Sequence, residues 1–136
     1  MLAAAAGCGG GAHSTGRSPE SVVRAWSVAI NSNDNEAAAR LFAPNARVIQ
    51  GPLDIHLRTH RLAVAFNASL PCSGRVVLLF RDGDVVTATF ALGPRGGDYP
   101  PCIGSGDRAA AAFTIRRGRI VEWQQIEPPP ASAAST

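Results

Sequence analysis

The fold of this chain is decided by residues 18–50, SPESVVRAWSVAINSNDNEAAARLFAPNARVIQ. Ser18 is a favourable helix N-cap because its hydroxyl can accept a hydrogen bond from an otherwise unpaired backbone amide, and Pro19 suits the first helical position. Apolar residues then recur at three- and four-residue intervals, which predicts an amphipathic helix of about three turns. Its buried face is expected to carry Val22, Val23, Trp26, Ala29 and Ile30.

The same stretch also predicts a second helix and a strand. The first helix should end at residues 31–33, Asn-Ser-Asn, after which Asp34 can cap a second short helix that runs through Phe42. Pro44-Asn45 is typical of a turn, and it should lead into a strand from Ala46 to Gln50. Residues 18–50 therefore predict two helices and a strand.

A third helix is predicted from Leu53 to Leu70, because apolar residues again recur along one face and Pro71 ends the pattern. On such a helix His56 and His60 would lie four residues apart. Two histidines are too few to hold a metal ion, and no third ligand is close in sequence. We therefore predict no metal site and expect both histidines at the surface.

The remainder of the chain reads as a sheet. Two β-rich runs, 75–81 and 85–92, are joined by Asp82-Gly83-Asp84, which is a strong hairpin signal. A long Gly/Pro loop, 93–107, leads to a run at 108–115 whose residues alternate between two faces. This run should form a second hairpin with residues 120–126.

The segments VVRAWSVAINSNDNEAAARLFAPNARV and RRGRIVEW resemble the nuclear transport factor 2-like superfamily, which includes ketosteroid isomerases and polyketide cyclases. The resemblance covers residues 18–127. It implies an α+β cone in which three N-terminal helices pack on a curved, mostly antiparallel sheet, with a ligand pocket at the open end and homodimers through the sheet. It does not imply one activity, because this fold carries enzymes, transport factors and binding modules.

The catalytic residues of the isomerases can be compared with this sequence position by position. The residues that match their oxyanion-binding tyrosine, their general-base aspartate and their protonated aspartic acid are Trp26, Gln50 and Ala111. None of these side chains can transfer a proton as those acids do. We therefore predict a non-catalytic domain without a cofactor that binds an apolar small molecule or a protein partner. Its pocket should be lined by Trp26, Gln50, Phe66, Phe90, Ala111, Phe113 and Trp123, with the Trp26 N–H and the Gln50 amide orienting the ligand.

Two alternatives remain open at this stage. The domain could be an isomerase, cyclase or hydrolase that uses His56 or Glu122 with Tyr99. Glu122 would face the cone only if the last strand had the opposite parity to the one that places Trp123 and Gln125 inward. The other alternative is that the aromatic side chains simply fill the cone and leave no cavity.

Residues 1–17 do not read as part of the domain. Ala5-Ala6-Gly7-Cys8 resembles the end of a bacterial lipoprotein signal, although a complete signal has a basic start and a longer apolar segment. We expect Cys8 to carry lipid, residues 9–17 to be a tether, and the protein to be exported and anchored at the cell envelope. A cytoplasmic protein with an ordinary N-terminal extension is the alternative.

Cys72 and Cys102 each follow a proline in a loop, and the first predicted hairpin lies between them. This placement predicts a disulfide, which would agree with export. The alternative is two free thiols in a reducing cytosol, and no spacing indicates a zinc site.

The composition sets the remaining limits. A chain of 136 residues suits one domain, and the low-complexity end, residues 128–136, should be disordered. The net charge is +3 and every basic residue is an arginine, but the arginines are scattered through the sequence. This pattern does not favour binding to nucleic acid.

Overall fold

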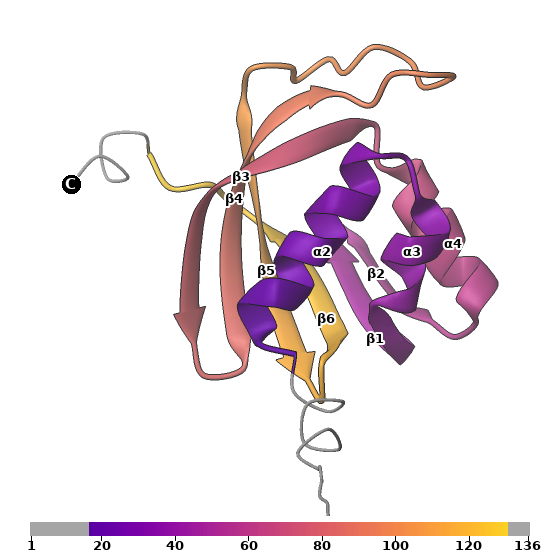
Figure 1. Ribbon diagram of the computed structural model, residues 1–136, viewed down its shortest axis with the longest axis vertical. Coiled ribbons are helices and arrows are strands. Elements are labelled where there is room, and N and C mark those ends of the chain that lie inside the picture. Colours follow the sequence, from indigo (N-terminus) through magenta and orange to yellow (C-terminus); the bar gives the residue numbers. More distant parts are fainter. Residues whose placement is uncertain (1–16, 131–136) are drawn as a thin grey trace, which may run out of the picture.

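The computed structural model describes residues 17–130, in which three helices pack on one six-stranded sheet (Figure 1). The helices are α2 (Pro19–Asn31), α3 (Asn35–Arg40) and α4 (His60–Ser69). The strands are β1 (Phe42–Gln50), β2 (Leu53–Leu57), β3 (Cys72–Asp82), β4 (Val85–Pro94), β5 (Arg108–Arg116) and β6 (Arg119–Ile126). The predicted tether with Cys8 and the last six residues of the predicted tail lie outside the described residues.

The sheet has the order β2-β1-β6-β5-β4-β3, and all of its neighbours are antiparallel except the β1–β6 pair. It curves around α2, and all three helices lie on the same side of it (Figure 1). The predicted α+β cone with a mostly antiparallel sheet is confirmed. No helix among residues 17–130 is long and apolar enough to cross a membrane.

The local signals at the helix starts act as the sequence predicts. The Ser18 hydroxyl accepts a hydrogen bond from the Ser21 amide at 3.1 Å, and the Asp34 carboxylate accepts one from the Ala37 amide at 2.9 Å. The buried face of α2 carries the predicted apolar residues, with Val22 and Val23 completely buried. Such caps and apolar stripes fix where a helix begins and which side it buries.

The prediction of one helix from Leu53 to Leu70 is wrong. Gly51 has a positive φ of 57°, so the chain turns back and β2 pairs with β1. Thr59 then caps α4 by accepting a hydrogen bond from the Leu62 amide at 3.1 Å. His56 therefore lies on a strand and His60 at a helix start, so the two do not share a helical face.

The second helix also ends earlier than expected, at Arg40, and β1 begins at Phe42 rather than at Ala46. Phe42 is already paired with Ile120 of β6, and the Ile120 amide donates to the Leu41 carbonyl at 2.8 Å. The residues that suggested a turn lie inside the strand, where the register between β1 and β6 shifts. Tertiary pairing thus overrides the local turn signal.

Candidate functional site

A cavity of about 220 Å³, partly open to solvent, lies between the second half of α2 and the inner face of the sheet. The connection from α4 into β3 closes one side, and β4, β5 and β6 form the wall opposite. Its apolar lining consists mainly of Trp26, Ile30, Leu70, Pro71, Phe90, Leu92, Ala109, Ala110, Ala111 and Trp123. Its polar lining residues are Ser27, Gln50, Ser73 and Gln125.

The three positions that the resemblance matches to the isomerase acid, base and second donor all line this cavity. Trp26 comes from α2, Gln50 from the end of β1 and Ala111 from β5, and Phe90 and Trp123 also line the wall. An indole, an amide and a methyl group therefore stand at one site, although they are far apart in the sequence.

Phe66 and Phe113, which the sequence predicts in the lining, lie behind it instead. The Phe113 ring is completely buried, 5.3 Å between centroids from the Trp26 ring, and Phe66 packs 5.1 Å from the Trp123 ring. Both contacts are edge-to-face, which aromatic pairs favour. These two rings therefore fix the orientation of the tryptophans rather than offering a surface to a ligand.

The indole N–H of Trp26 is used by the fold. It donates to Oδ1 of Asn67 at 2.8 Å, and the Asn67 side chain in turn donates to the Ala63 carbonyl at 2.7 Å. Asn67 lies on α4 and is completely buried. The expectation that the Trp26 N–H orients a ligand is thus wrong, because its one donor is already occupied.

Trp123 differs from Trp26 in this respect. Its side chain is 5 % exposed, and its Nε1 is buried without a hydrogen-bond partner among the described residues. Most buried polar groups in folded proteins are paired, and leaving one unpaired is unfavourable by about 1–3 kcal/mol. The Trp123 side chain lines the cavity, but its Nε1 has almost no accessible surface and so does not open onto the cavity.

The other polar groups of the lining fall into two kinds. The Ser27 hydroxyl donates to the Gly74 carbonyl at 2.8 Å, and the Ser73 hydroxyl lies 3.1–3.2 Å from carbonyls of β4, so both are held by backbone. Gln50 is half-buried and Gln125 is exposed. Their amides can supply polar contacts nearer to solvent.

Among the described residues, no side chain that titrates lines this cavity, since its cysteine, Cys72, is bonded to another cysteine. Glu122 lies on the opposite face of β6, where its carboxylate is 3.8 Å from the Arg47 guanidinium. The strand parity that would turn Glu122 into the cone is therefore excluded. Tyr99 donates its hydroxyl to the Ala68 carbonyl at 3.0 Å, and His56 lies against the Asn45 carbonyl, so the structure does not bring these three groups together.

Among the comparisons with known proteins, only those with solved structures give matches. No protein-family model matches the chain, and no curated protein matches it. A solved nuclear transport factor 2-like protein of unknown function from Cytophaga hutchinsonii matches 85% of this chain and 94% of its own, with a TM-score of 0.66 and 14% identity. The chain has the nuclear transport factor 2-like fold.

Two further solved structures share this nuclear transport factor 2-like fold. A proposed polyketide cyclase from Sinorhizobium meliloti is 23% identical, with a TM-score of 0.61 over 78% of this chain and 94% of the cyclase. A ketosteroid isomerase-like protein from Catenulispora acidiphila, solved with trimethylamine, is 19% identical, with a TM-score of 0.58 over 77% of this chain and 83% of its own. At these identities the likeness establishes the fold alone.

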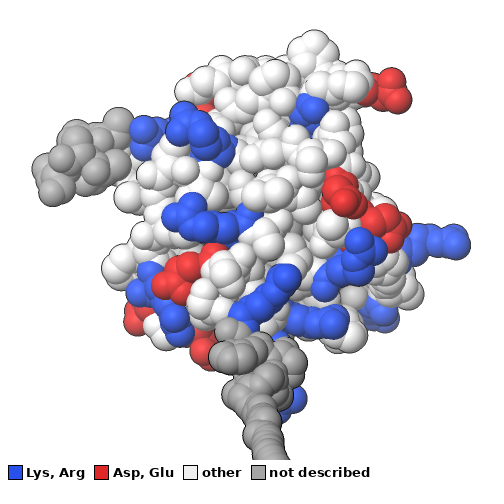
Figure 2. Space-filling model, viewed as in Figure 1, with Lys and Arg blue, Asp and Glu red and all other residues white. Residues whose placement is uncertain are grey.

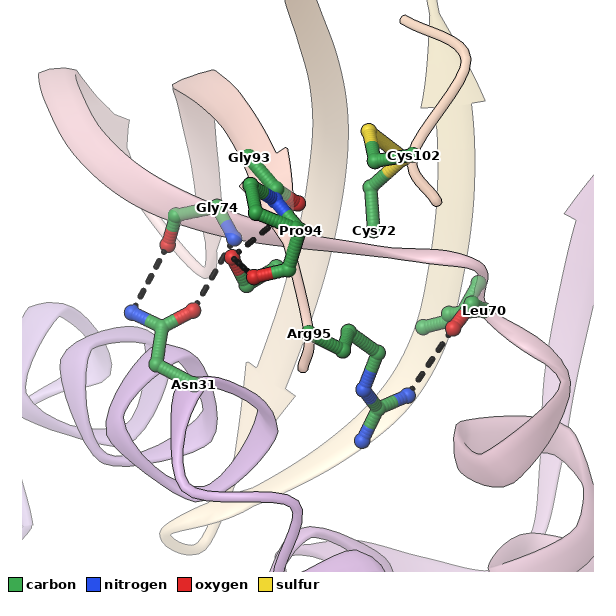
Figure 3. Close-up of a disulfide and its surroundings, with 9 residues drawn as sticks. Asn31, Leu70, Cys72, Gly74, Gly93, Pro94, Arg95 and Cys102 are labelled. Atoms are coloured by element: carbon green, nitrogen blue, oxygen red, sulfur yellow. Dashed lines mark hydrogen bonds between the residues drawn. A yellow bond between two sulfur atoms is a disulfide. The ribbon is translucent and has the colours of Figure 1, made fainter. Parts of the chain in front are cut away.

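Cys72, which lines the cavity, forms a disulfide in this nuclear transport factor 2-like domain (Figure 3). Cys72 and Cys102 are bonded with their Cα atoms 5.1 Å apart, so the predicted bridge is confirmed. Beside it the Asn31 side chain, at the end of α2, pairs with both backbone groups of Gly74 at 2.9 and 3.0 Å. These links hold the end of α2, the start of β3 and the 95–107 loop around the cavity.

Sequence reasoning missed Asn67 and the α4–β3 connection as parts of the site. Asn67 had a recognisable signal, because a lone amide among apolar residues of a predicted helix needs a buried partner. The connection, Leu70-Pro71, and the start of β3 had none of this kind. Their place in the wall depends on how α4 packs across the cone.

In this nuclear transport factor 2-like domain, no group of three or more His, Cys, Asp or Glu side chains could hold a metal ion within residues 17–130. Elsewhere in the domain, a bidentate hydrogen bond from Arg47 to Asp54, at 2.7 and 2.9 Å, lowers the pKa of that carboxyl group. This pair is exposed, on the outer side of the β1–β2 edge, and does not contribute to the cavity.

Proposed function

We propose that this domain binds a small, mainly apolar molecule that carries at least one hydrogen-bond acceptor, and that it does not transform this molecule. The observation that carries the proposal is the lining of the cavity, which is mostly aromatic and aliphatic and has the amides of Gln50 and Gln125 among its few polar side chains. A ligand carbonyl or ether oxygen would accept a hydrogen bond from one of these amides, while the rest of the ligand would cover the aromatic and aliphatic walls.

The size of the cavity limits the ligand. Pockets that enclose a drug-sized molecule usually measure about 300–1,000 Å³, whereas this one measures about 220 Å³. The ligand is therefore either smaller than a steroid or extends past the rim, where Gln50 and Gln125 can contact its polar end. An amphipathic ketone, ester or short-chain lipid has the required combination of groups.

The side chains that line the cavity do not suit acid–base catalysis. General acid–base chemistry needs a titratable group within hydrogen-bond reach of the substrate, and the described lining residues include none. At the positions of the isomerase residues, Trp26 is engaged with Asn67, Gln50 is an amide and Ala111 has no polar atom. These features favour binding over proton transfer.

Matched ligands give the sharpest test. A medium-chain 2-ketone and the alkane of equal length should both raise the melting temperature and change the tryptophan fluorescence, with the ketone binding more tightly. The Gln50→Leu variant keeps a side chain of similar size but loses the amide, so it should weaken ketone binding by about 2- to 10-fold and leave alkane binding nearly unchanged.

Two outcomes would contradict the proposal. If neither ligand, nor any member of a panel of lipids and steroids, alters fluorescence or melting temperature, then the cavity is not a binding site. Turnover of a bound 3-ketosteroid would refute the non-catalytic part while leaving the binding part intact.

We also propose that the protein is exported and anchored through lipid on Cys8. The disulfide supports an oxidising compartment, since such bonds are rare in reducing cytosol. Cys8→Ala should then move the protein from the membrane fraction to the soluble fraction. A wild-type protein that is already soluble when expressed from its native start codon would contradict the anchor.

A further inference from the structure

A second hollow, of about 440 Å³, lies away from the apolar cavity, between α2, α3 and the β5–β6 turn. Four arginines line it: Arg17 before α2, Arg40 at the end of α3, and Arg117 and Arg119 at the turn. Figure 2 shows blue residues, with some red ones between them, over the lower half of this face, where Figure 1 places the start of α2 and the β5–β6 turn. We call this hollow the arginine groove.

The arginine groove has almost no compensating negative charge. No acidic residue lines it, and the structure gives no salt bridge to Arg17, Arg117 or Arg119 within the described residues. Arg40 has only a long contact, 3.9 Å, with Glu36. Residues 1–16 and 131–136 contain no Asp or Glu, so no acidic side chain from those segments can neutralise the groove either.

The backbone conformation of the β5–β6 turn also supports a role for Arg117 in the groove. Arg117 and Gly118 have φ values of 53° and 76°, as in the two-residue turns that favour Asn-Gly. A long side chain in this left-handed conformation is unfavourable by about 1 kcal/mol. An arginine therefore stands where the turn itself would favour asparagine or glycine, and this arginine lines the groove.

The floor of the groove is apolar, formed by Ala25, Ala29, Ala37 and Leu41. It offers a ligand no polar side chain, so the polar contacts must come from the guanidinium groups. Guanidinium forks match the oxygens of a phosphate group, and a dianionic phosphate suits several cations better than a single carboxylate does. An adjoining hollow shares Arg40 and Arg119 and adds Arg58, which extends the basic surface.

We propose that the arginine groove binds a phosphate group, carried either by a soluble small molecule or by the headgroup of a lipid. This site is separate from the apolar cavity and does not depend on what that cavity binds. The two sources share the same recognition chemistry, and they differ in whether the phosphate is presented in solution or on a surface.

The test compares two double variants of the full chain that remove the same charge. Arg40→Gln/Arg119→Gln removes two groove arginines, whereas Arg75→Gln/Arg108→Gln removes two exposed arginines that do not line the groove. Titration with inorganic phosphate and pyrophosphate at low salt, followed by NMR or calorimetry, should show about a tenfold or greater loss of affinity for the groove variant alone. Thermal melting of each variant checks that it is folded.

A second arm distinguishes the sources. Vesicles of phosphatidylglycerol, compared with phosphatidylcholine, should bind through the same arginines if the phosphate belongs to a lipid, and pyrophosphate should compete. Preference for pyrophosphate without vesicle binding assigns a soluble ligand. Equal losses in the two double variants would mean that net charge alone attracts anions, and no binding of any phosphate probe by the wild type would also overturn the proposal.

Discussion

Arg95 is a buried cation that has no carboxylate partner among residues 17–130, and its replacement by methionine should strongly destabilise the domain. Its side chain is 5 % exposed. The guanidinium donates to the carbonyls of Asn67 and Leu70 at 2.8 and 2.9 Å, and to the amide oxygens of Asn33 and Asn35 at 2.8 and 2.7 Å. One side chain thus joins the 95–107 loop to the α2–α3 turn and to the end of α4; the Leu70 contact is visible in Figure 3.

Two opposing effects determine how much Arg95 contributes to the free energy of unfolding. A hydrogen bond with a charged donor contributes about 1.5–3 kcal/mol, so four of them would sum to about 6–12 kcal/mol. Burial of a guanidinium without a counter-charge is unfavourable by several kcal/mol, and the same burial lowers the pKa of Arg95. The stacking of Arg95 over the Tyr99 ring, at 4.2 Å, recovers part of that loss. We expect Arg95→Met to reduce the free energy of unfolding by about 3 kcal/mol.

Urea and thermal unfolding monitored by circular dichroism would measure this change, which corresponds to a melting temperature lower by about 12 °C. Arg75→Met, at an exposed position, is the matched control and should change little. Arg95→Lys keeps the charge but cannot reach four acceptors, so it should be nearly as destabilised. A loss below about 1 kcal/mol for Arg95→Met would show that desolvation cancels the hydrogen bonds.

Three further predictions concern other parts of the domain. Replacing Cys72 and Cys102 by serine should lower the free energy of unfolding by about 3.5 kcal/mol, because the bridge closes a long loop; a loss under about 1 kcal/mol in urea would refute this. Arg47 holds the pKa of Asp54 below its ordinary value of 3.8, so this pair stabilises fully above that pH and less as the pH falls through the lowered pKa. Arg47→Gln should raise the NMR titration midpoint of Asp54 towards 3.8, and an unchanged midpoint would contradict the pairing. Phe80 is 65 % exposed on β3; we propose that a second copy covers this side of the sheet, so Phe80→Asp should turn a dimer into a monomer in sedimentation, whereas a monomeric wild type would exclude the dimer.

Local signals in the sequence were sufficient for much of the fold. The Ser18 cap with the apolar stripe behind it specified α2, and the Asp-Gly-Asp turn at residues 82–84 specified the hairpin of β3 and β4. Alternation along residues 108–115 placed Ala111 and Phe113 on the buried face. Each of these features depends on residues within a few positions of one another.

The errors occurred where distant pairing decided the structure. Residues 53–57 carry an apolar pattern short enough to suit either a helix or a strand, and pairing with β1 made them β2. Phe42 similarly joined β1 because Ile120, near the other end of the chain, pairs with it in parallel. No local pattern contains this information, since the energy comes from a partner that only the fold brings close.

The candidate site was likewise predictable from local patterns and resemblance only in part. Alternation predicted that Trp123 and Gln125 face inward, and the resemblance to the isomerases predicted that Trp26, Gln50 and Ala111 share one site. The sequence could not predict which indole N–H would be free, because the partner of Trp26 is 41 residues away, on α4.

Neither of the two indole N–H groups is open to the cavity. Both tryptophans are almost fully buried, and both contribute ring surface to the same cavity. Asn67 satisfies one donor and so makes Trp26 part of the framework, whereas the donor of Trp123 has no partner among the described residues. A group that recognises a ligand must open onto the cavity, and among the lining side chains the amides of Gln50 and Gln125 lie nearer to solvent. We therefore infer that polar recognition in this domain depends on these two amides, and that the two indoles contribute apolar ring surface.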